Sequence, residues 1–161
     1  HDGQAGITGR RQVAGDAAGD PGRDRKLHAL VQTVARDVPS PEPHTPVDFD
    51  VWTARHLGSP NLIPALYLVA LDGDRYVGLS HMSASQHEPR ELYTGLTGTL
   101  REYRRRGIFR KMYHFIKEQA GINDIAGLRL YVETKNLNAK KTYEALGMSS
   151  EHYSFYEWMR V

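Results

Sequence analysis

A run of arginines around one glycine is the part of this sequence best suited to chemistry. The run is Tyr103-Arg104-Arg105-Arg106-Gly107-Ile108-Phe109-Arg110, and it lies between a predicted strand and the start of a predicted helix. The first N–H groups of a helix have no partner within the helix, and the helix dipole adds partial positive charge there. Such a segment favours an anion, above all a phosphate group. A solvated basic helix start and a nucleic-acid-binding patch are the alternative interpretations.

A second polar group follows later in the chain. Asn136-Leu137-Asn138-Ala139 precedes Tyr143-Glu144-Ala145-Leu146-Gly147-Met148. Asn136 and Tyr143 are two helical turns apart, so one helix places them on the same face. The alternatives are that Asn136 only caps this helix and that Tyr143 only packs against a sheet.

The composition excludes several kinds of site. The 161 residues include no cysteine, which excludes a disulfide scaffold, a thiol nucleophile and a thiolate metal site. The eight histidines show no metal-ligand spacing. The longest apolar stretch, residues 62–71, contains Pro64 and is too short to span a bilayer. Since the chain starts with His1 and no apolar signal segment follows, we expect a cytoplasmic protein, given as a processed or trimmed chain.

Charge divides the chain into two parts. Residues 1–100 carry a net charge of −3 and residues 101–161 a net charge of +5. All prolines lie at or before Pro89, and five of the six lysines lie at or after Lys111. Local structural need explains this split, and recombination of two sequences is the alternative. A basic and an acidic half suit an anionic ligand at one end and a cationic ligand at the other.

The predicted elements place the arginine run between a strand and a helix. Apolar spacing predicts a first helix with Asp20 as N-cap and Pro21 at its first position, followed by an extended loop at residues 39–43. Thr45 and Asp48 predict the capping box of a short second helix. Strands are predicted at residues 7–13, 66–71, 76–83, 91–100, 128–132 and 153–159, a hairpin turn at 72–74, a loop at 86–90, and helices at 107–120 and 139–146.

The arginine run resembles the phosphate signature of the GNAT superfamily of acetyl-CoA-dependent N-acetyltransferases. That signature is Gln/Arg-x-x-Gly-x-Gly/Ala; Arg104 and Gly107 match it, whereas Phe109 replaces the small third residue. The family's second signature, Asn-x-x-Ala followed by Tyr-Glu-x-Leu-Gly-Phe/Met, matches residues 136–139 and 143–148. The resemblance is sharpest over residues 92–157.

The resemblance implies a fold, a domain organisation and a co-substrate. The fold is α/β, with a mixed, mainly antiparallel sheet, a splayed parallel strand pair and flanking helices, in a single domain of residues 1–161. Acetyl-CoA is the expected co-substrate, and no metal is expected. In the family, backbone amides of the phosphate loop bind the pyrophosphate, and the pantetheine arm pairs with a strand and contacts the asparagine. The residues expected to bind coenzyme A are Thr97, Gly98, Thr99, Arg104, Arg105, Arg106, Gly107, Ile108, Phe109, Arg110, Asn136, Ala139 and Lys140.

Catalytic roles follow from the same resemblance. The family's tyrosine, here Tyr143, protonates the departing thiolate; in water this transfer, from a phenol of pKa about 10 to a thiolate of pKa about 8.5, is modestly uphill. Some relatives carry a glutamate as base where this sequence has Tyr93. Glu91, on the same strand, and Glu133, at the end of the neighbouring strand, are therefore the candidate bases, or only solvated carboxylates. We expect His81 near the cleft in a structural role.

The acceptor region of the family corresponds here to the first two helices and their loop. Glu42, Asp48, Asp50, Phe49 and Trp52 suit a cationic amine, and they also suit the caps and core of a short helix. We expect a small-molecule amine or a peptide as acceptor, and no nucleic acid or membrane as partner. The resemblance leaves a homodimer open.

The sequence therefore predicts an acyltransferase that moves an acetyl group from acetyl-CoA to a primary amine by direct attack in a ternary complex. A chain without cysteine excludes an acyl-cysteine intermediate. A non-catalytic coenzyme A-binding regulatory domain, or one half of a tandem acetyltransferase, is the alternative. A nucleic-acid-binding module would instead show steeply salt-dependent binding to DNA or RNA.

Overall fold

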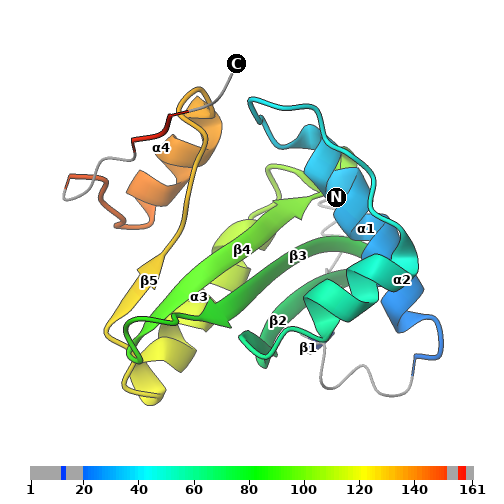
Figure 1. The fold of residues 1–161 in the computed structure, drawn as a ribbon, viewed down its shortest axis with the longest axis horizontal. Helices are drawn as coiled ribbons and strands as arrows, with labels where there is room; N and C mark the ends of the chain where they lie inside the picture. Colours follow the sequence, from blue (N-terminus) through cyan, green and yellow to red (C-terminus); the bar gives the residue numbers. More distant parts are fainter. Residues whose placement is uncertain (1–11, 14–19, 152–155, 159–161) are drawn as a thin grey trace, which may run out of the picture. The chain divides into compact units, whose positions relative to one another are not determined.

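The computed structural model describes residues 12–13, 20–151 and 156–158 and divides into two compact units, His1–Tyr131 and Val132–Val161. The first unit holds a five-stranded sheet, and the second holds one helix (Figure 1). Within the described part, no helix is both long and apolar enough to cross a membrane. In chain order the elements are β1 (Gln12–Val13), α1 (Arg23–Asp37), α2 (Phe49–Trp52), η2 (Thr53–Leu57), β2 (Leu62–Asp72), β3 (Arg75–Ala84), β4 (Glu91–Thr99), η3 (Arg101–Tyr103), α3 (Ile108–Ile122), β5 (Gly127–Arg129) and α4 (Leu137–Ala145).

The sheet has the strand order β1-β2-β3-β4-β5. Neighbouring strands are antiparallel except for β4 and β5, which are parallel and pair from Glu91–Gly127 to Tyr93–Arg129. Helix α3 connects these two strands, as the change from alternating to helical apolar spacing predicts. This arrangement confirms the mixed α/β fold.

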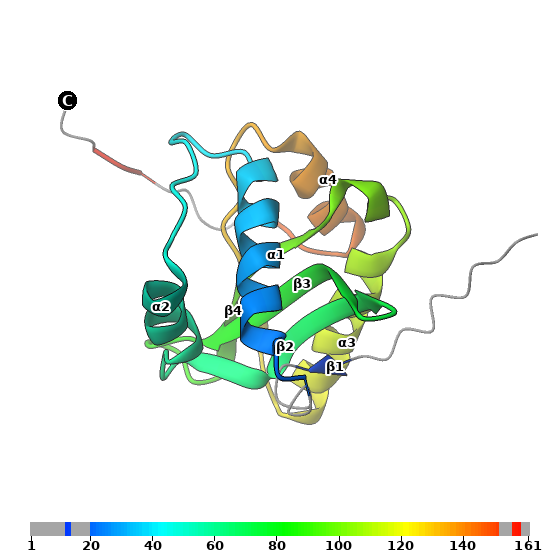
Figure 2. The same ribbon diagram turned by 90° about the vertical axis from the view of Figure 1, so that its right-hand side faces the viewer.

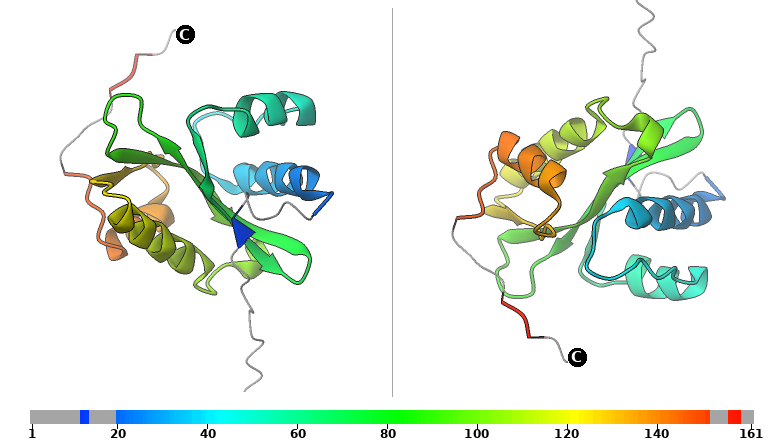
Figure 3. Two further views of the ribbon diagram at one scale, coloured as in Figure 1. Left: turned by 90° about the horizontal axis from the view of Figure 1, so that it is seen from below. Right: turned by 90° about the horizontal axis from the view of Figure 1, so that it is seen from above.

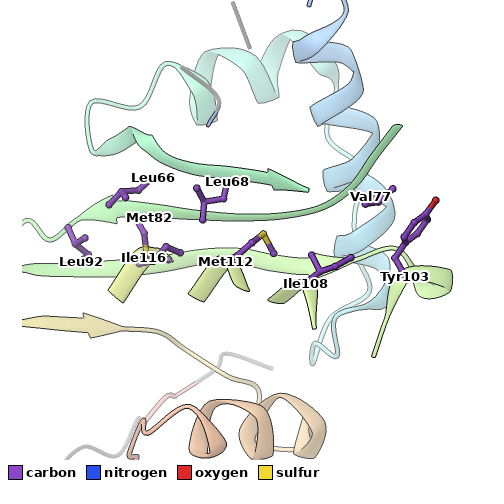
Figure 4. Close-up of a cluster of buried hydrophobic side chains, with 9 residues drawn as sticks. All are labelled: Leu66, Leu68, Val77, Met82, Leu92, Tyr103, Ile108, Met112 and Ile116. Atoms are coloured by element: carbon purple, nitrogen blue, oxygen red, sulfur yellow. The ribbon is translucent and has the colours of Figure 1, made fainter. Parts of the chain in front are cut away.

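Helices cover both faces of the sheet. Helices α1 and α2 lie on one face and α3 lies on the other (Figures 2 and 3). Successive side chains of a strand point to opposite faces, so the apolar run of β2 supplies both cores. Leu66 and Leu68 pack toward α3, whereas Tyr67 and Val69 pack toward α1 and α2. The α3 core is shown in Figure 4 and consists of Leu66, Leu68, Val77, Met82, Leu92, Tyr103, Ile108, Met112 and Ile116.

The predicted helix caps were wrong at both early helices. Helix α1 begins at Arg23 with Gly22 as N-cap, because the Asp20 carboxylate accepts from the Gly22 N–H (2.9 Å) and also binds Lys26. Helix α2 begins after Asp48, whose own carboxylate accepts from the Asp50 N–H (2.9 Å); the cap is therefore Asp48 and not Thr45.

The predicted strands differ from the observed ones mainly at their ends. The hairpin at residues 72–74 is confirmed, with Gly73 in the left-handed region (φ 57°). Strand β2 starts at Leu62 and not at residue 66, and β5 covers 127–129 and not 128–132. Of the predicted strand at 7–13, residues 12–13 are confirmed and the remainder lies outside the described residues. Residues 156–158 form no strand, and the other residues of the predicted strand at 153–159 lie outside the described residues.

Candidate functional site

The loop between η3 and α3 has the geometry of an anion-binding turn. Arg105 (φ 62°) and Gly107 (φ 74°) both adopt the left-handed conformation, which is uncommon for a residue other than glycine. Turns of this kind direct successive N–H groups into a concave surface that suits an anion. Among the described residues no side chain caps α3, and its first backbone hydrogen bond runs from Lys111 N–H to the Gly107 carbonyl (3.1 Å). The loop therefore combines N–H groups, a helix start and arginines in one place.

A buried tyrosine fixes the entry to this loop. Tyr103 is 9% exposed, and its hydroxyl donates to the Asp72 carboxylate at the β2–β3 turn (2.6 Å). The guanidinium groups of Arg75 and Arg106 lie 5.5 and 4.9 Å from the centre of its ring. The loop is thus held against the sheet immediately before its basic residues.

Phe109, which departs from the family signature, does not crowd the loop glycine. A Cβ atom built on Gly107 meets no atom within 4 Å. The Phe109 ring lies 6.0 Å from that of Tyr113, one turn further along α3. The space above Gly107 therefore remains open to a ligand.

Strand β4 offers backbone groups beyond the point where its pairing with β5 ends. That pairing stops at Tyr93 and Arg129, so residues 94–99 have no strand partner on this side within the described residues. Thr97, Gly98 and Thr99, predicted to pair with the pantetheine arm, lie in this stretch and pair on the other side with β3. The strands thus separate as the splayed pair requires.

Glu91 is engaged in an ion pair. Arg129 donates from Nε and Nη2 to its two carboxylate oxygens (2.6 and 2.7 Å). These hydrogen bonds lower the pKa of Glu91 below its ordinary value, so the carboxylate is a weaker base. The neighbouring Tyr93 ring stacks on that of Tyr131, with ring centres 6.0 Å apart.

His81 is buried in an aromatic cluster beside β4. It is 8% exposed, stacks on Tyr67 (5.1 Å between ring centres) and meets His56 edge-on (4.6 Å). Its Nδ1 atom is buried without a hydrogen-bond partner in the described structure. Burial, with a smaller contribution from His56, lowers the pKa of His81 to about 3, so the ring is neutral at physiological pH. These contacts support a structural role.

The His81 ring occupies the space that a side chain at residue 95 would need. A Cβ atom on Gly95 would lie 1.9 Å from His81 Cε1. We expect Gly95→Ala to lower the free energy of unfolding by about 1–3 kcal/mol, as in other overpacked cores. Gly121→Ala is the matched control: its Cβ meets nothing within 4 Å, and alanine favours a helix by up to about 1 kcal/mol. Equal stability of the Gly95→Ala variant and the wild type in urea unfolding would refute this packing.

Three of the predicted acceptor residues have structural roles in the first unit. Asp48 caps α2, Trp52 is buried, and the Phe49 ring lies 4.2 Å from the guanidinium carbon of Arg25. Gln32 fastens the loop before α2, since its side-chain oxygen accepts from Val47 N–H (3.2 Å) and bonds to His44 Nε2 (3.0 Å). The capping and core interpretation therefore accounts for Asp48, Phe49 and Trp52.

The second unit carries the other predicted site residues on and before α4. Asn136 is the N-cap of α4, and its side-chain oxygen accepts from the Ala139 N–H (3.2 Å). The Glu133 carboxylate accepts from the Lys135 N–H (2.8 Å). Tyr143 and Lys140 are half-buried, and Gly147 (φ 85°) follows the helix end. Capping is thus observed for Asn136, and it leaves the side-chain NH₂ group able to donate.

Sequence reasoning missed two carboxylates that hold the loop of residues 104–110 and the segment before it. They are Asp72, which accepts from Tyr103, and Asp37, which binds Arg101 and Arg104. Each lies more than 30 positions from its partners, beyond the reach of a local motif. The one available signal was Asp37 itself, since a carboxylate at a helix C-terminus is unfavourable without a cation.

Comparisons with known proteins agree with this geometry. A family model described as "Acetyltransferase (GNAT) family" matches residues 27–148. No curated protein matches the sequence.

Several solved structures share the fold. A possible acetyltransferase from Clostridium difficile 630 is 27% identical, with a TM-score of 0.68 over 95% of this chain and 97% of its own. An aminoglycoside acetyltransferase from an uncultured soil metagenomic sample, solved with sisomicin, is 13% identical, with a TM-score of 0.65 and 95% of both chains covered. AAC(6')-Iy, solved with a bisubstrate analogue containing CoA, is 12% identical, with a TM-score of 0.64 over 95% and 97%.

Proposed function

Because the chain belongs to the GNAT acetyltransferase family, we propose that it transfers the acetyl group of acetyl-CoA to a primary amine of a small molecule or peptide, by direct attack in a ternary complex. The observation that carries this proposal is the loop of residues 104–110, whose left-handed residues and uncapped helix start suit a pyrophosphate. The N–H groups of Arg105 to Arg110 bind the phosphates, and nearby arginine side chains add positive charge.

The thioester end of acetyl-CoA requires a strand edge and a proton donor. Thr97, Gly98 and Thr99 offer backbone groups to the pantetheine arm on the side of β4 that β5 leaves unpaired. A strand N–H donates to the oxygen that becomes negative when the amine attacks. Tyr143 donates a proton to the departing thiolate, and the NH₂ group of Asn136, with Ala139 and Lys140, contacts the cofactor.

The base that removes the amine proton is Glu133, directly or through water. Glu91 is less suited, since its two oxygens accept from Arg129 and its pKa is lowered. The Glu133 carboxylate accepts a hydrogen bond from the Lys135 N–H, and its remaining lone pairs can accept the proton of the amine.

We expect Glu133→Gln to lower kcat by about 100-fold at neutral pH, since general-base catalysis contributes on that scale. Glu91→Gln should lower kcat by less than about tenfold, which is smaller than the loss expected when a general base is removed. A loss of at least about 100-fold in Glu91→Gln and not in Glu133→Gln would reverse this assignment.

Glu91→Gln should instead change the acid dependence of stability. The pKa of Glu91 is lower in the folded chain than its ordinary value of 4.5. The ion pair therefore stabilises the fold above that pH, and this stabilisation is lost as the pH falls through the lowered pKa. We expect the melting temperature of the wild type to fall more steeply below pH 4.5 than that of Glu91→Gln. Parallel curves would show that the ion pair does not stabilise the fold.

Release of free thiol from acetyl-CoA tests the proposed function. The amine panel should include peptide amines, polyamines and aminoglycosides. Aminoglycosides are included because one protein of similar fold is an aminoglycoside acetyltransferase solved with sisomicin, and another was solved with an acetylneamine analogue linked to CoA. Amine-dependent thiol release, with acetylated product in the mass spectrum, supports the proposal. Tight binding of coenzyme A without turnover on any amine would favour a non-catalytic regulatory domain.

A further inference from the structure

Asp37 is an unusual last residue for helix α1. The carbonyl groups at a helix C-terminus carry partial negative charge, so a carboxylate there is unfavourable without a cation nearby. Its side chain is only 12% exposed, which adds the cost of removing the charge from water. A nearby positive charge must offset both effects.

Two arginines of the phosphate-loop segment supply that charge. Arg101 donates from Nη2 (2.5 Å) and Nε (3.0 Å) to Asp37, and Arg104 donates from Nη2 to the second oxygen (2.6 Å). These hydrogen bonds, that of Arg101 above all, hold the pKa of Asp37 below its usual range. A single carboxylate thereby ties α1 to the chain between β4 and α3.

The arginines of this segment therefore fall into two groups. Arg101 and Arg104 are paired with Asp37. Arg105, Arg106 and Arg110 are exposed and form no ion pair among the residues that the structure describes. Of these three, Arg106 lies over the Tyr103 ring. Of the two left-handed residues that shape the loop, Arg105 comes directly after the anchored Arg104.

We propose that Asp37 is the positioning residue of the phosphate loop and that Arg104, the first residue of the family signature, acts through Asp37 as an anchor and not as a phosphate ligand. Arg105 and Arg110 are then the side chains that meet the phosphates. The proposal rests on the proposed binding of coenzyme A at this loop. In this proposal the carboxylate of Asp37 connects helix α1, which belongs to the expected acceptor region, to the loop that binds coenzyme A.

Unfolding of the ligand-free protein tests the anchor without coenzyme A. Asp37→Asn and Arg104→Ala, alone and combined, are compared in urea. When two substitutions remove the same ion pair, the double variant loses less free energy of unfolding than the sum of the two single losses. We expect this coupling between Asp37 and Arg104; strictly additive effects would overturn the anchor.

Calorimetric titration with coenzyme A then tests the role of Arg104. We expect Asp37→Asn, Arg104→Ala and the double variant each to weaken binding by a similar factor, roughly three- to tenfold, as for one lost charge-assisted contact. Arg105→Ala and Arg110→Ala should also reduce the salt dependence of binding, because salt screens a direct contact with phosphate. Arg104→Ala should keep the salt dependence of the wild type.

If Arg104 were itself a phosphate ligand, the affinity for coenzyme A and its salt dependence would change in the opposite way. If Arg104 binds phosphate and only rests on Asp37, Asp37→Asn releases it and tightens binding, and Arg104→Ala reduces the salt dependence; either result overturns the proposal. Arg90→Ala is the matched control, since it breaks the exposed ion pair with Asp124 and should change neither the affinity for coenzyme A nor its salt dependence. If the wild type binds no coenzyme A, the proposed function fails, and coupling or additivity in the ligand-free protein decides the anchor.

Discussion

Replacing Tyr143 by phenylalanine is expected to lower kcat by about 100-fold, the scale of a lost general acid. The KM for acetyl-CoA should change little, because the hydroxyl is needed in the transition state and the ring that packs is retained. Steady-state kinetics of thiol release measure both constants. Tyr143 is half-buried on α4, and its backbone carbonyl accepts from Leu146 and Met148 N–H groups, which the substitution leaves intact.

Tyr156→Phe is the control for this experiment. Tyr156 is 90% exposed in the same unit, so loss of its hydroxyl should alter neither kcat nor stability. A Tyr143→Phe variant with near-normal kcat would leave the tyrosine with a packing role only. A variant that melts well below the wild type would instead identify the hydroxyl as a buried hydrogen-bonding group.

Coenzyme A should stabilise the protein through the phosphate loop. At about 100 times its Kd, a ligand that binds only the folded state adds about 2.7 kcal/mol to the free energy of unfolding. We expect the combined substitution of Arg105, Arg106 and Arg110 by alanine to remove most of this gain, as followed by thermal unfolding with and without coenzyme A.

The matched control removes three positive charges elsewhere. Arg55, Arg90 and Lys117 are exposed and lie outside the loop, so their combined substitution by alanine should keep the full gain. Equal loss in both variants would show that net charge, and not the loop, attracts the ligand. An unchanged gain in the loop variant would place the phosphates elsewhere.

The parts of the fold that the sequence predicts are those fixed by local patterns. The spacing of Ile108, Met112 and Ile116 predicts α3, and the same residues form its buried face. The start of α1 was missed because Asp20 acts before the helix: its carboxylate accepts from the Gly22 N–H and Lys26, and also from the Tyr76 hydroxyl (2.9 Å), 56 positions later in the chain. A contact over that distance leaves no local signal beside the helix.

The candidate site divides in the same way. Residues 104–110 are contiguous, so their types and spacing alone are enough to predict a phosphate loop. The partners that set their roles are distant: Asp37 holds Arg104 across 67 positions, and Arg129 holds Glu91 across 38. Ion pairing of Glu91 changes its basicity, a property that the identity of the residue alone does not give.

Backbone amide shifts during a titration with coenzyme A test the central claim most directly, because the proposed ligands of the pyrophosphate are N–H groups. In ¹H–¹⁵N spectra we expect the largest changes at Arg105 to Arg110, with further changes at Thr97, Gly98 and Thr99 of β4. Pantetheine, which lacks the phosphate groups of coenzyme A, should shift the β4 signals and leave those of the loop in place. Saturable binding of coenzyme A with unchanged loop amides, and with its largest shifts elsewhere, would contradict the account.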